Sequence, residues 1–465
     1  MSGRNLKAAR LAGAFAAVAV LAGCASVSSD RGFGTVSALA KQRLGQDVRL
    51  LRNDDDARAL DALITEKLRT PLTADDAVQI ALLNNRALQS TYWNVGIAHA
   101  DLVQAGRLKN PSFAFQRTRQ GDAVDIERSL TFNLVGLLTA PLATRIENRR
   151  FEQTRLMVAD DILKHAAKTR LAYFDAVAAV QGLAYARQVA ASAEASFELT
   201  GRMAQAGNVS RLDLARQQVF QAEATAAVAR AGKHAVASRE HLARLMGLWG
   251  TGSAYLLPDR LPDLPAAAAE IRDIERIAVR ERLDIQAARI EAAHTASSLG
   301  LTKTTRFINV FDLGYVRNAA AGEAAAPGYA ISLELPLFDW GGARVARSEA
   351  IYMQAVNKVA QAAVEARSEA RETYLDYRTS YDLARHYRDQ VIPLRKKISD
   401  ETMLRYNGML VSVFELLADA REQAAAVNST IDALKEYWMA HTRLEAALGG
   451  HLPAQPATAN KGTAR

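Results

Sequence analysis

One short pattern of residues stands out in this sequence. A glycine is followed by a serine, and an acidic residue comes three residues after the serine. It occurs within residues 206–214 and again within residues 406–417, each time after a long alanine-rich segment. Glycine tolerates the left-handed conformation that ends many helices, serine caps a new helix, and an acid at N3 completes a capping box. The pattern therefore predicts two helical hairpin tips, and its recurrence predicts an internal repeat. The tip residues are Gly207, Ser210 and Asp213, and then Tyr406, Gly408, Ser412 and Glu415.

The only cysteine, Cys24, indicates a different chemistry. It follows a basic start, an apolar run over residues 11–20 and the small residues Ala22 and Gly23, which is the layout of a secretory signal peptide. Leu-Ala-Gly-Cys resembles a bacterial lipobox, in which the sulfur receives a diacylglycerol and cleavage makes the cysteine the first residue. Acyl chains contribute about 0.8 kcal/mol per buried CH₂, so several chains together hold a protein at a membrane. The alternative is a small buried cysteine in an ordinary signal or anchor helix.

Patterns that would indicate catalysis or metal binding are missing from the sequence. The 8 histidines are scattered, without a His-Glu-x-x-His motif, and no second cysteine can share a metal with Cys24. Residues 250–253 lack the rest of a phosphate-binding loop. The formal net charge is +8, but the sequence contains no basic stripe with interleaved aromatic residues. This argues against nucleic-acid binding. We therefore expect no enzymatic activity, no cofactor, no metal and no nucleic-acid partner.

Helical periodicity accounts for most of the 465 residues. Thr73 as N-cap with Asp76 at N3 starts a helix that continues to about residue 108. Long helices then run to each tip, over residues 156–200 and 343–406, and return over residues 212–246 and 413–448. At 1.5 Å per residue, fifty-odd residues span roughly 80 Å, so these are long antiparallel coiled hairpins. Pro393 is expected to bend the longer one.

Alternating residues predict four strands. Residues 129–134 alternate between apolar and polar side chains, and Phe113 and Phe115 begin a preceding strand that a loop around Gly121 joins to it. The same alternation of apolar and polar side chains recurs in two runs, over residues 307–315 and 329–335. Each strand is near the ~9–11 residues that cross a bilayer, and the smallest membrane barrels have about eight strands. Because every edge must be paired in lipid, several copies must share one barrel; three copies give about twelve strands. The alternative is a soluble sheet of two hairpins.

The two halves of the sequence share one predicted order of elements, which is helix, hairpin, helix, tip and helix. Some residues also match, such as Ile80-Ala81 in the first half and Ile277-Ala278 in the second. We expect a signal peptide over residues 1–23, a lipidated N-terminal segment over 24–70, a first repeat over 71–250 and a connector over 251–270. A second repeat follows over 271–450, and a flexible tail over 451–465.

Four short segments carry a resemblance to a known family: Leu72-Thr73 with Asp76-Ala77, residues 282–285, the Pro-Leu-Phe-Asp-Trp-Gly-Gly segment over 336–342, and the second tip. By these segments the sequence resembles the outer membrane efflux protein family, the TolC-like ducts and their lipid-anchored relatives. Asn85-Arg86 and Arg282-Leu283 depart from the family, because relatives usually have proline second in each pair. The first half also has Pro-Leu-Ala-Thr-Arg over 141–145 in place of the second half's Phe-Asp-Trp-Gly-Gly.

The resemblance implies a mainly α fold with a membrane β-barrel portion, assembled as a trimeric α/β-barrel tube. It implies an outer-membrane location, lipid-anchored through a palmitate-type modification of Cys24, with the helices extending into the periplasm. The tube would passively conduct small molecules or metal ions, supplied by an inner-membrane efflux pump. A periplasmic adaptor would dock on the seven tip residues, which would also form the gate. Alternatives are a pore-less periplasmic coiled-coil adaptor or scaffold lipoprotein, and a type I protein secretion duct.

Overall fold

The structure, a computed structural model, describes residues 28, 30–250, 254–308, 310–320 and 322–452. Cys24, the predicted signal peptide and residues 453–465 of the predicted tail lie outside the described residues. The chain divides into two units. Unit 1 comprises residues up to 36 together with 92–158 and 283–363, and unit 2 comprises 37–91, 159–282 and the residues from 364 onward.

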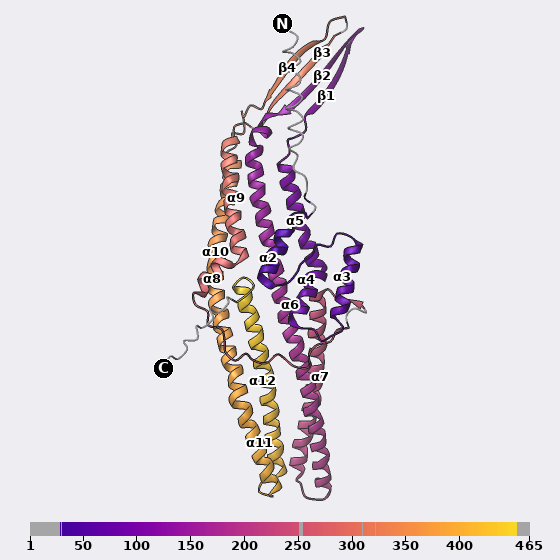
Figure 1. The fold of residues 1–465 in the computed structure, drawn as a ribbon, viewed down its shortest axis with the longest axis vertical. Helices are drawn as coiled ribbons and strands as arrows, with labels where there is room; N and C mark the ends of the chain where they lie inside the picture. The colour runs from indigo at the N-terminus through magenta and orange to yellow at the C-terminus, as the bar shows by residue number, and fades with distance from the viewer. Residues whose placement is uncertain (1–27, 29, 251–253, 309, 321, 453–465) are drawn as a thin grey trace, which may run out of the picture. The chain divides into compact units, whose positions relative to one another are not determined.

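The described chain is mainly helical with one four-stranded sheet, which confirms the predicted mainly α fold with four strands (Figure 1). Within the described residues, two short helices come first, α2 (Gly34–Leu44) and α3 (Asp54–Lys67). The order that follows is helix, helix, hairpin, long helix, return helix, and it occurs twice. The first set is α4 (Ala74–Asn84), α5 (Arg86–Ala105), β1 (Ser112–Gln120), β2 (Ala123–Asn133), α6 (Leu134–Gln205) and α7 (Arg211–Met246). The second is α8 (Ile274–Glu281), α9 (Leu283–Thr305), β3 (Phe311–Ala319), β4 (Ala326–Leu333), α10 (Gly342–His386), η2 (Tyr387–Val391), α11 (Ile392–Asn407) and α12 (Val413–Ala447).

The sheet of unit 1 is antiparallel throughout, in the order β1-β2-β3-β4. The pairing of β2 with β3 joins the two halves of the sequence, with Leu130 opposite Tyr315 and Phe132 opposite Leu313. Because successive side chains of a strand point to opposite faces, these apolar residues share one face of the sheet. Ser129 and the residues paired with it on the adjacent strands lie on the other face. β1 and β4 are the outer strands of the sheet formed by the described residues.

The first long helix begins earlier than the periodicity predicted. Leu134 was expected to end a strand, but it is the first residue of α6, and Pro141 lies inside that helix. The side chain of Asn133 is the physical reason: its Oδ1 accepts a hydrogen bond from the backbone N–H of Gly136, the N3 position, so it caps α6. Its Nδ2 also donates to Asp312 Oδ1 at 2.8 Å, which ties the cap to β3.

The outer helix is broken in both repeats, although the predicted helix from Thr73 to about residue 108 was continuous. The break falls at Asn85 (φ −66°, ψ 116°) between α4 and α5, and at Arg282 (φ −65°, ψ 129°) between α8 and α9. Neither position precedes a proline. Asn85 Oδ1 instead accepts from the N–H of Leu88 at 3.0 Å, which caps α5.

A glycine at the end of each return helix packs against that break. Gly247 (φ +70°) follows α7, and a Cβ there would lie 2.8 Å from the carbonyl oxygen of Asn84. Gly449 (φ +90°) follows α12, and its Cβ would lie 3.0 Å from the carbonyl oxygen of Glu281. Only glycine allows both the left-handed backbone and such a short distance to a carbonyl oxygen. The return helices of the two repeats therefore end in the same way.

The helix before the second tip is interrupted close to the proline that was expected to bend it. Regular α-helix changes to a π-helical turn over Tyr387–Val391, and Pro393 is the second residue of α11. A proline cannot donate to the carbonyl four residues back, so the turn before it adopts a wider hydrogen-bonding pattern.

The core of unit 2 consists of aromatic clusters and closely packed alanines. One cluster includes Leu72, Tyr173 and Tyr255, and the other includes Tyr377 and Tyr437. Buried alanines such as Ala176, Ala370 and Ala440 let the helix backbones approach closely, as the alanine-rich composition suggests.

Candidate functional site: the helical tips and the open sheet

The first tip places its three predicted residues where capping chemistry requires them. The N–H of Gly207 donates to Ala204 at 3.0 Å and the N–H of Asn208 donates to Met203 at 2.9 Å, which together form a Schellman motif. Gly207 is left-handed with φ +76°. Ser210 then caps α7, because its Oγ accepts from the N–H of Asp213 at 3.1 Å and donates to the Asp213 carboxylate at 2.7 Å.

At the second tip, the left-handed position at the helix end is occupied by a different residue from the one predicted. The N–H of Met409 donates to Tyr406 at 2.9 Å and that of Leu410 donates to Arg405 at 2.8 Å, so the Schellman motif has Met409 at C′. Met409 has φ +57°, whereas Gly408 has φ −80°. Gly408 was expected to take the left-handed position, and that prediction was wrong by one residue. Ser412 caps α12 as predicted, accepting from the N–H of Glu415 at 3.3 Å.

The second tip also exposes large apolar side chains. Met409 is 94% exposed and Leu410 is 78% exposed, and Leu212 at the first tip is 60% exposed. A methionine held in the left-handed region costs roughly 1–2 kcal/mol. Strain of this kind persists at sites where the surrounding structure enforces it, and such sites are often functional.

The two hairpins contact each other a few turns from the tips, through residues that the sequence did not suggest. Arg421 of α12 donates to the side chain of Gln217 of α7 at 3.1 Å, and its guanidinium lies 4.3 Å from the ring centroid of Phe220. Gln217 is only 2% exposed. Helical periodicity places such residues on a face but cannot say which distant helix that face meets.

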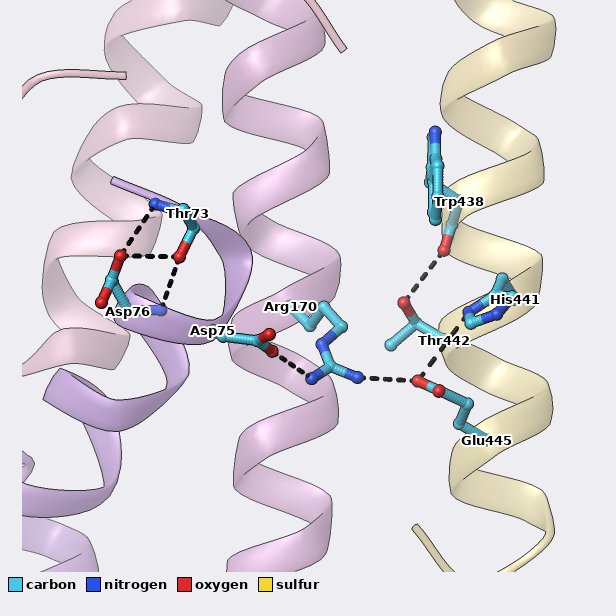
Figure 2. Close-up of polar contacts among 8 residues, drawn as sticks. All are labelled: Thr73, Asp75, Asp76, Arg170, Trp438, His441, Thr442 and Glu445. Atoms are coloured by element: carbon cyan, nitrogen blue, oxygen red, sulfur yellow. Dashed lines mark hydrogen bonds and ion pairs between the residues drawn. The ribbon is translucent and has the colours of Figure 1, made fainter. Parts of the chain in front are cut away.

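A second inter-repeat contact centres on Arg170 of α6 (Figure 2). Its guanidinium donates to Asp75 at the start of α4 at 2.8 Å and to Glu445 of α12 at 2.7 Å. His441 lies one turn before Glu445, with its Nδ1 3.8 Å from the same carboxylate. These residues line a cavity of about 710 Å³ whose wall includes the stacked rings of Phe174 and Trp438. One arginine thus connects the first repeat with the second.

The pKa values around this contact reflect burial. Desolvation lowers the pKa of His441, so the neutral imidazole is favoured, although Glu445 opposes the shift. Burial also raises the pKa of Tyr173, which hydrogen-bonds the carbonyl of Leu72, to about 12. For Asp76, burial alone would raise the pKa, but hydrogen bonds from Lys67 and Thr73 outweigh it and lower the pKa. The capping box of Thr73 and Asp76 is complete, as predicted.

The sheet of unit 1 exposes its apolar face and both of its edges. Along β1, Phe113 and Phe115 are 67% and 55% exposed, and along β4, Tyr329 and Ile331 are 80% and 60% exposed. An exposed edge with flanking apolar side chains is a template for pairing with another chain.

Two other kinds of site are absent from the described part of the chain. It contains no cluster of three or more His, Cys, Asp or Glu residues arranged to hold a metal ion. Among the same residues, none of the helices combines the length and the apolar character that a membrane crossing would need.

Comparison with protein-family models found no match, and comparison with curated proteins found none either. Several solved structures share the fold. A membrane protein from Pseudomonas aeruginosa aligns with a TM-score of 0.70 and 20% identity over 81% of this chain and 93% of that chain. The outer-membrane channel OprN aligns with a TM-score of 0.68 and 20% identity, covering 83% and 92%. The Campylobacter jejuni CmeC outer membrane channel aligns with a TM-score of 0.65 and 16% identity, covering 82% and 87%. The chain described here therefore has the fold of outer-membrane channels.

Proposed function

We propose that this chain is the outer-membrane exit duct of a tripartite efflux system. Three copies close one barrel of about twelve strands, which continues into a tube of helices. Small molecules or metal ions pass through it passively, delivered by an inner-membrane pump through a periplasmic adaptor that docks on the two tips. Acylation of Cys24 anchors each copy in the outer membrane. The fold shared with OprN and CmeC, which are outer-membrane channels, supports this proposal.

The observation that carries the proposal is the open sheet. Among the described residues, the four strands have an exposed apolar face and two edges without a partner strand. Such a sheet is unstable by itself in lipid, because each unsatisfied backbone group there costs several kcal/mol. β1 and β4 run antiparallel to each other, since all three pairings between them are antiparallel. Pairing of β4 in one copy with β1 in the next therefore continues the alternation and satisfies both edges. A pore-less adaptor gives no role to the exposed apolar face.

Disulfide trapping across the sheet edges tests the assembly. Within one chain, β1 and β4 are separated by three strand spacings of about 4.8 Å, roughly 14 Å in all, whereas a disulfide needs Cα atoms within about 7 Å. A Cys at Ala114 in β1, combined in turn with a Cys at Gly328, Ala330 or Ser332 in β4, can therefore cross-link only between copies. We expect at least one pair to give a ladder that ends at three chains in denaturing gels.

The matched control is Ala114→Cys with Ser129→Cys, because these residues are paired within one chain and must give no ladder. The wild-type protein, purified with its lipid, should also pass ions through planar bilayers. A monomeric protein in detergent that forms no inter-chain disulfide and carries no current would exclude the duct.

A further inference from the structure

The charged residues of the four strands are divided by sign between the two faces of the sheet. Because side chains alternate along a strand, the pairing register assigns each residue to a face. The arginines of the strands all lie on the apolar face, and the acids all lie on the opposite face. The arginines are Arg117, Arg119, Arg128 and Arg317, and the acids are Asp125, Glu127 and Asp312. The sheet itself therefore separates the arginines from these acids.

Three of the arginines gather on neighbouring strands. Arg128 of β2 is directly opposite Arg317 of β3, and Arg117 of β1 is the diagonal neighbour of Arg128. Cβ atoms in such positions are about 5–8 Å apart, within the reach of long side chains. Like charges directly opposite each other destabilise a sheet, so this arrangement needs an anion to offset it. We call Arg117, Arg128 and Arg317 the arginine cluster.

The arginine cluster has no counter-charge among the described residues. All three of its members are exposed, and none of them forms a hydrogen bond or an ion pair with another described residue. Arg119 differs, because it donates to the carbonyl of Gly121 at 3.0 Å and lies 3.9 Å from Asp122. In the proposed ring, the strand next to β1 is β4 of another copy, and β4 contains no charged residue. The anion is therefore expected to come from outside the ring of copies.

The arginine cluster lies toward the ends of the strands that are away from the helices of unit 1. β1 and β3 leave those helices at residues 112 and 311 and run toward the hairpin turns. The apolar row of Phe132 and Leu313 comes first, and the row of Arg128 and Arg317 follows four residues later, about 13 Å along the strands. With the helices in the periplasm, this end of the sheet reaches the outer leaflet. An arginine there can extend its charged head from an apolar face to nearby phosphates.

We propose that the arginine cluster binds the phosphate groups of a phosphorylated glycolipid in the outer leaflet. A guanidinium forms two parallel hydrogen bonds with a phosphate, which suits arginine better than lysine. A phosphomonoester carries about −1.5 to −2 charges at pH 7, so it can neutralise two arginines, whereas the phosphodiester of a phospholipid carries a single charge. The paired arginines therefore fit a phosphomonoester better. This inference rests on the proposed function, which places the apolar face of the sheet in lipid.

Titration with a purified glycolipid tests the arginine cluster. The full-length protein, delipidated in a neutral detergent, is titrated with diphosphoryl lipid A, and binding is measured by microscale thermophoresis. We expect Arg128→Gln combined with Arg317→Gln to weaken binding by about tenfold or more, because the charge-assisted hydrogen bonds are lost. The matched control is Asp125→Asn combined with Glu127→Gln, which alters two charges of the same strand region on the opposite face and should not weaken binding. Equal weakening in both double variants would contradict the inference.

A single substitution and two comparison ligands complete the test. Arg117→Gln should by itself weaken the binding of lipid A several-fold, so the result does not depend on the folding of a double variant. Diphosphoryl lipid A should bind more tightly than phosphatidylglycerol or inorganic phosphate. Equal affinity for phosphatidylglycerol would overturn the assignment to a glycolipid, and unchanged affinity in every arginine variant would overturn the cluster as the binding site.

The bilayer current of the same wild-type preparation distinguishes this inference from the proposed function. If the protein conducts ions and its arginine variants bind lipid A as tightly as the wild type, the inference is wrong and the duct stands. If the protein stays monomeric and carries no current, the proposed function is wrong, and the inference that rests on it fails as well.

Discussion

Met409 shows how a one-residue shift changes the energetics of a tip. Its left-handed backbone should cost roughly 1–2 kcal/mol compared with glycine. Met409→Gly is therefore expected to raise the free energy of unfolding by about 1 kcal/mol. Gly408→Ala should change it little, because φ is −80° and the nearest atom to an added Cβ lies at 3.5 Å. Thermal unfolding of the purified protein measures both.

Gly207→Ala is the control for this comparison. Gly207 is left-handed, but an added Cβ would meet no atom within 4 Å, so only the backbone cost of roughly 1 kcal/mol remains. If Gly408→Ala destabilised as much as Gly207→Ala, the glycine and not the methionine would occupy the left-handed position.

His441 should make stability depend on pH. Burial lowers its pKa in the folded state below the unfolded value of 6.5, so the unfolded chain binds the proton more readily. The stabilisation is fully present above pH 6.5 and declines as the pH falls below that value. Denaturant unfolding of the wild type should therefore show a loss of stability from about pH 7 to pH 5.

His441→Gln should make that loss smaller, because the glutamine has no proton to gain. The lowered pKa of Asp76 does not interfere, since its contribution to stability is lost only as the pH falls below the pKa of 3.8 that the carboxyl group has in the unfolded chain. Parallel pH profiles for the wild type and the variant would show that His441 does not contribute.

At the scale of elements, the break between α4 and α5 is the feature most open to redesign. Arg86 is the first residue of α5, where the helix needs no backbone N–H, and Asn85 before it already has the extended conformation that proline imposes. Arg86→Pro is therefore expected to be tolerated, or to stabilise by about 0.4–1 kcal/mol through the unfolded chain.

Leu88→Pro is the matched opposite case. The N–H of Leu88 donates to Asn85 Oδ1, and the side chain is only 5% exposed, so proline removes both the cap and the packing. We expect a loss of about 3 kcal/mol or more in the free energy of unfolding. Equal effects of the two prolines would mean that the helix does not restart at Arg86.

For the whole molecule, the two faces of β4 should respond differently to charge. Ile331 lies on the apolar face, 60% exposed, and Ser332 points to the opposite face. Ile331→Lys places a charge in lipid, which costs about 2–4 kcal/mol at mid-depth, so assembly in the outer membrane should fall. Ser332→Lys should assemble normally and change the ion selectivity of the current. Equal loss of assembly in both variants would contradict a lipid-facing and a channel-facing side.

The sequence was sufficient for several features that depend on neighbouring residues. The periods of the helices and strands, the caps at Thr73, Ser210 and Ser412, and the turn at Gly121 all follow from side chains a few residues apart. The same local chemistry placed the N-caps of α7 and α12 at the predicted residues, Ser210 and Ser412. The shift from Gly408 to Met409 shows the limit, because two adjacent residues can each satisfy the helix end and the exact register depends on the loop as a whole.

Only the tertiary structure decided which distant residues meet. Nothing near Arg170 in the chain indicates Asp75 or Glu445, and the glycines at 247 and 449 look like ordinary helix ends until the opposite backbone is seen at 2.8 and 3.0 Å. The pairing of β2 with β3 likewise joins strands about 180 residues apart, with Asn133 opposite Asp312. Such contacts depend on how whole helices and strands pack in space. The periodicity of the sequence predicts which face of an element can be buried, but it does not predict which distant element packs against that face.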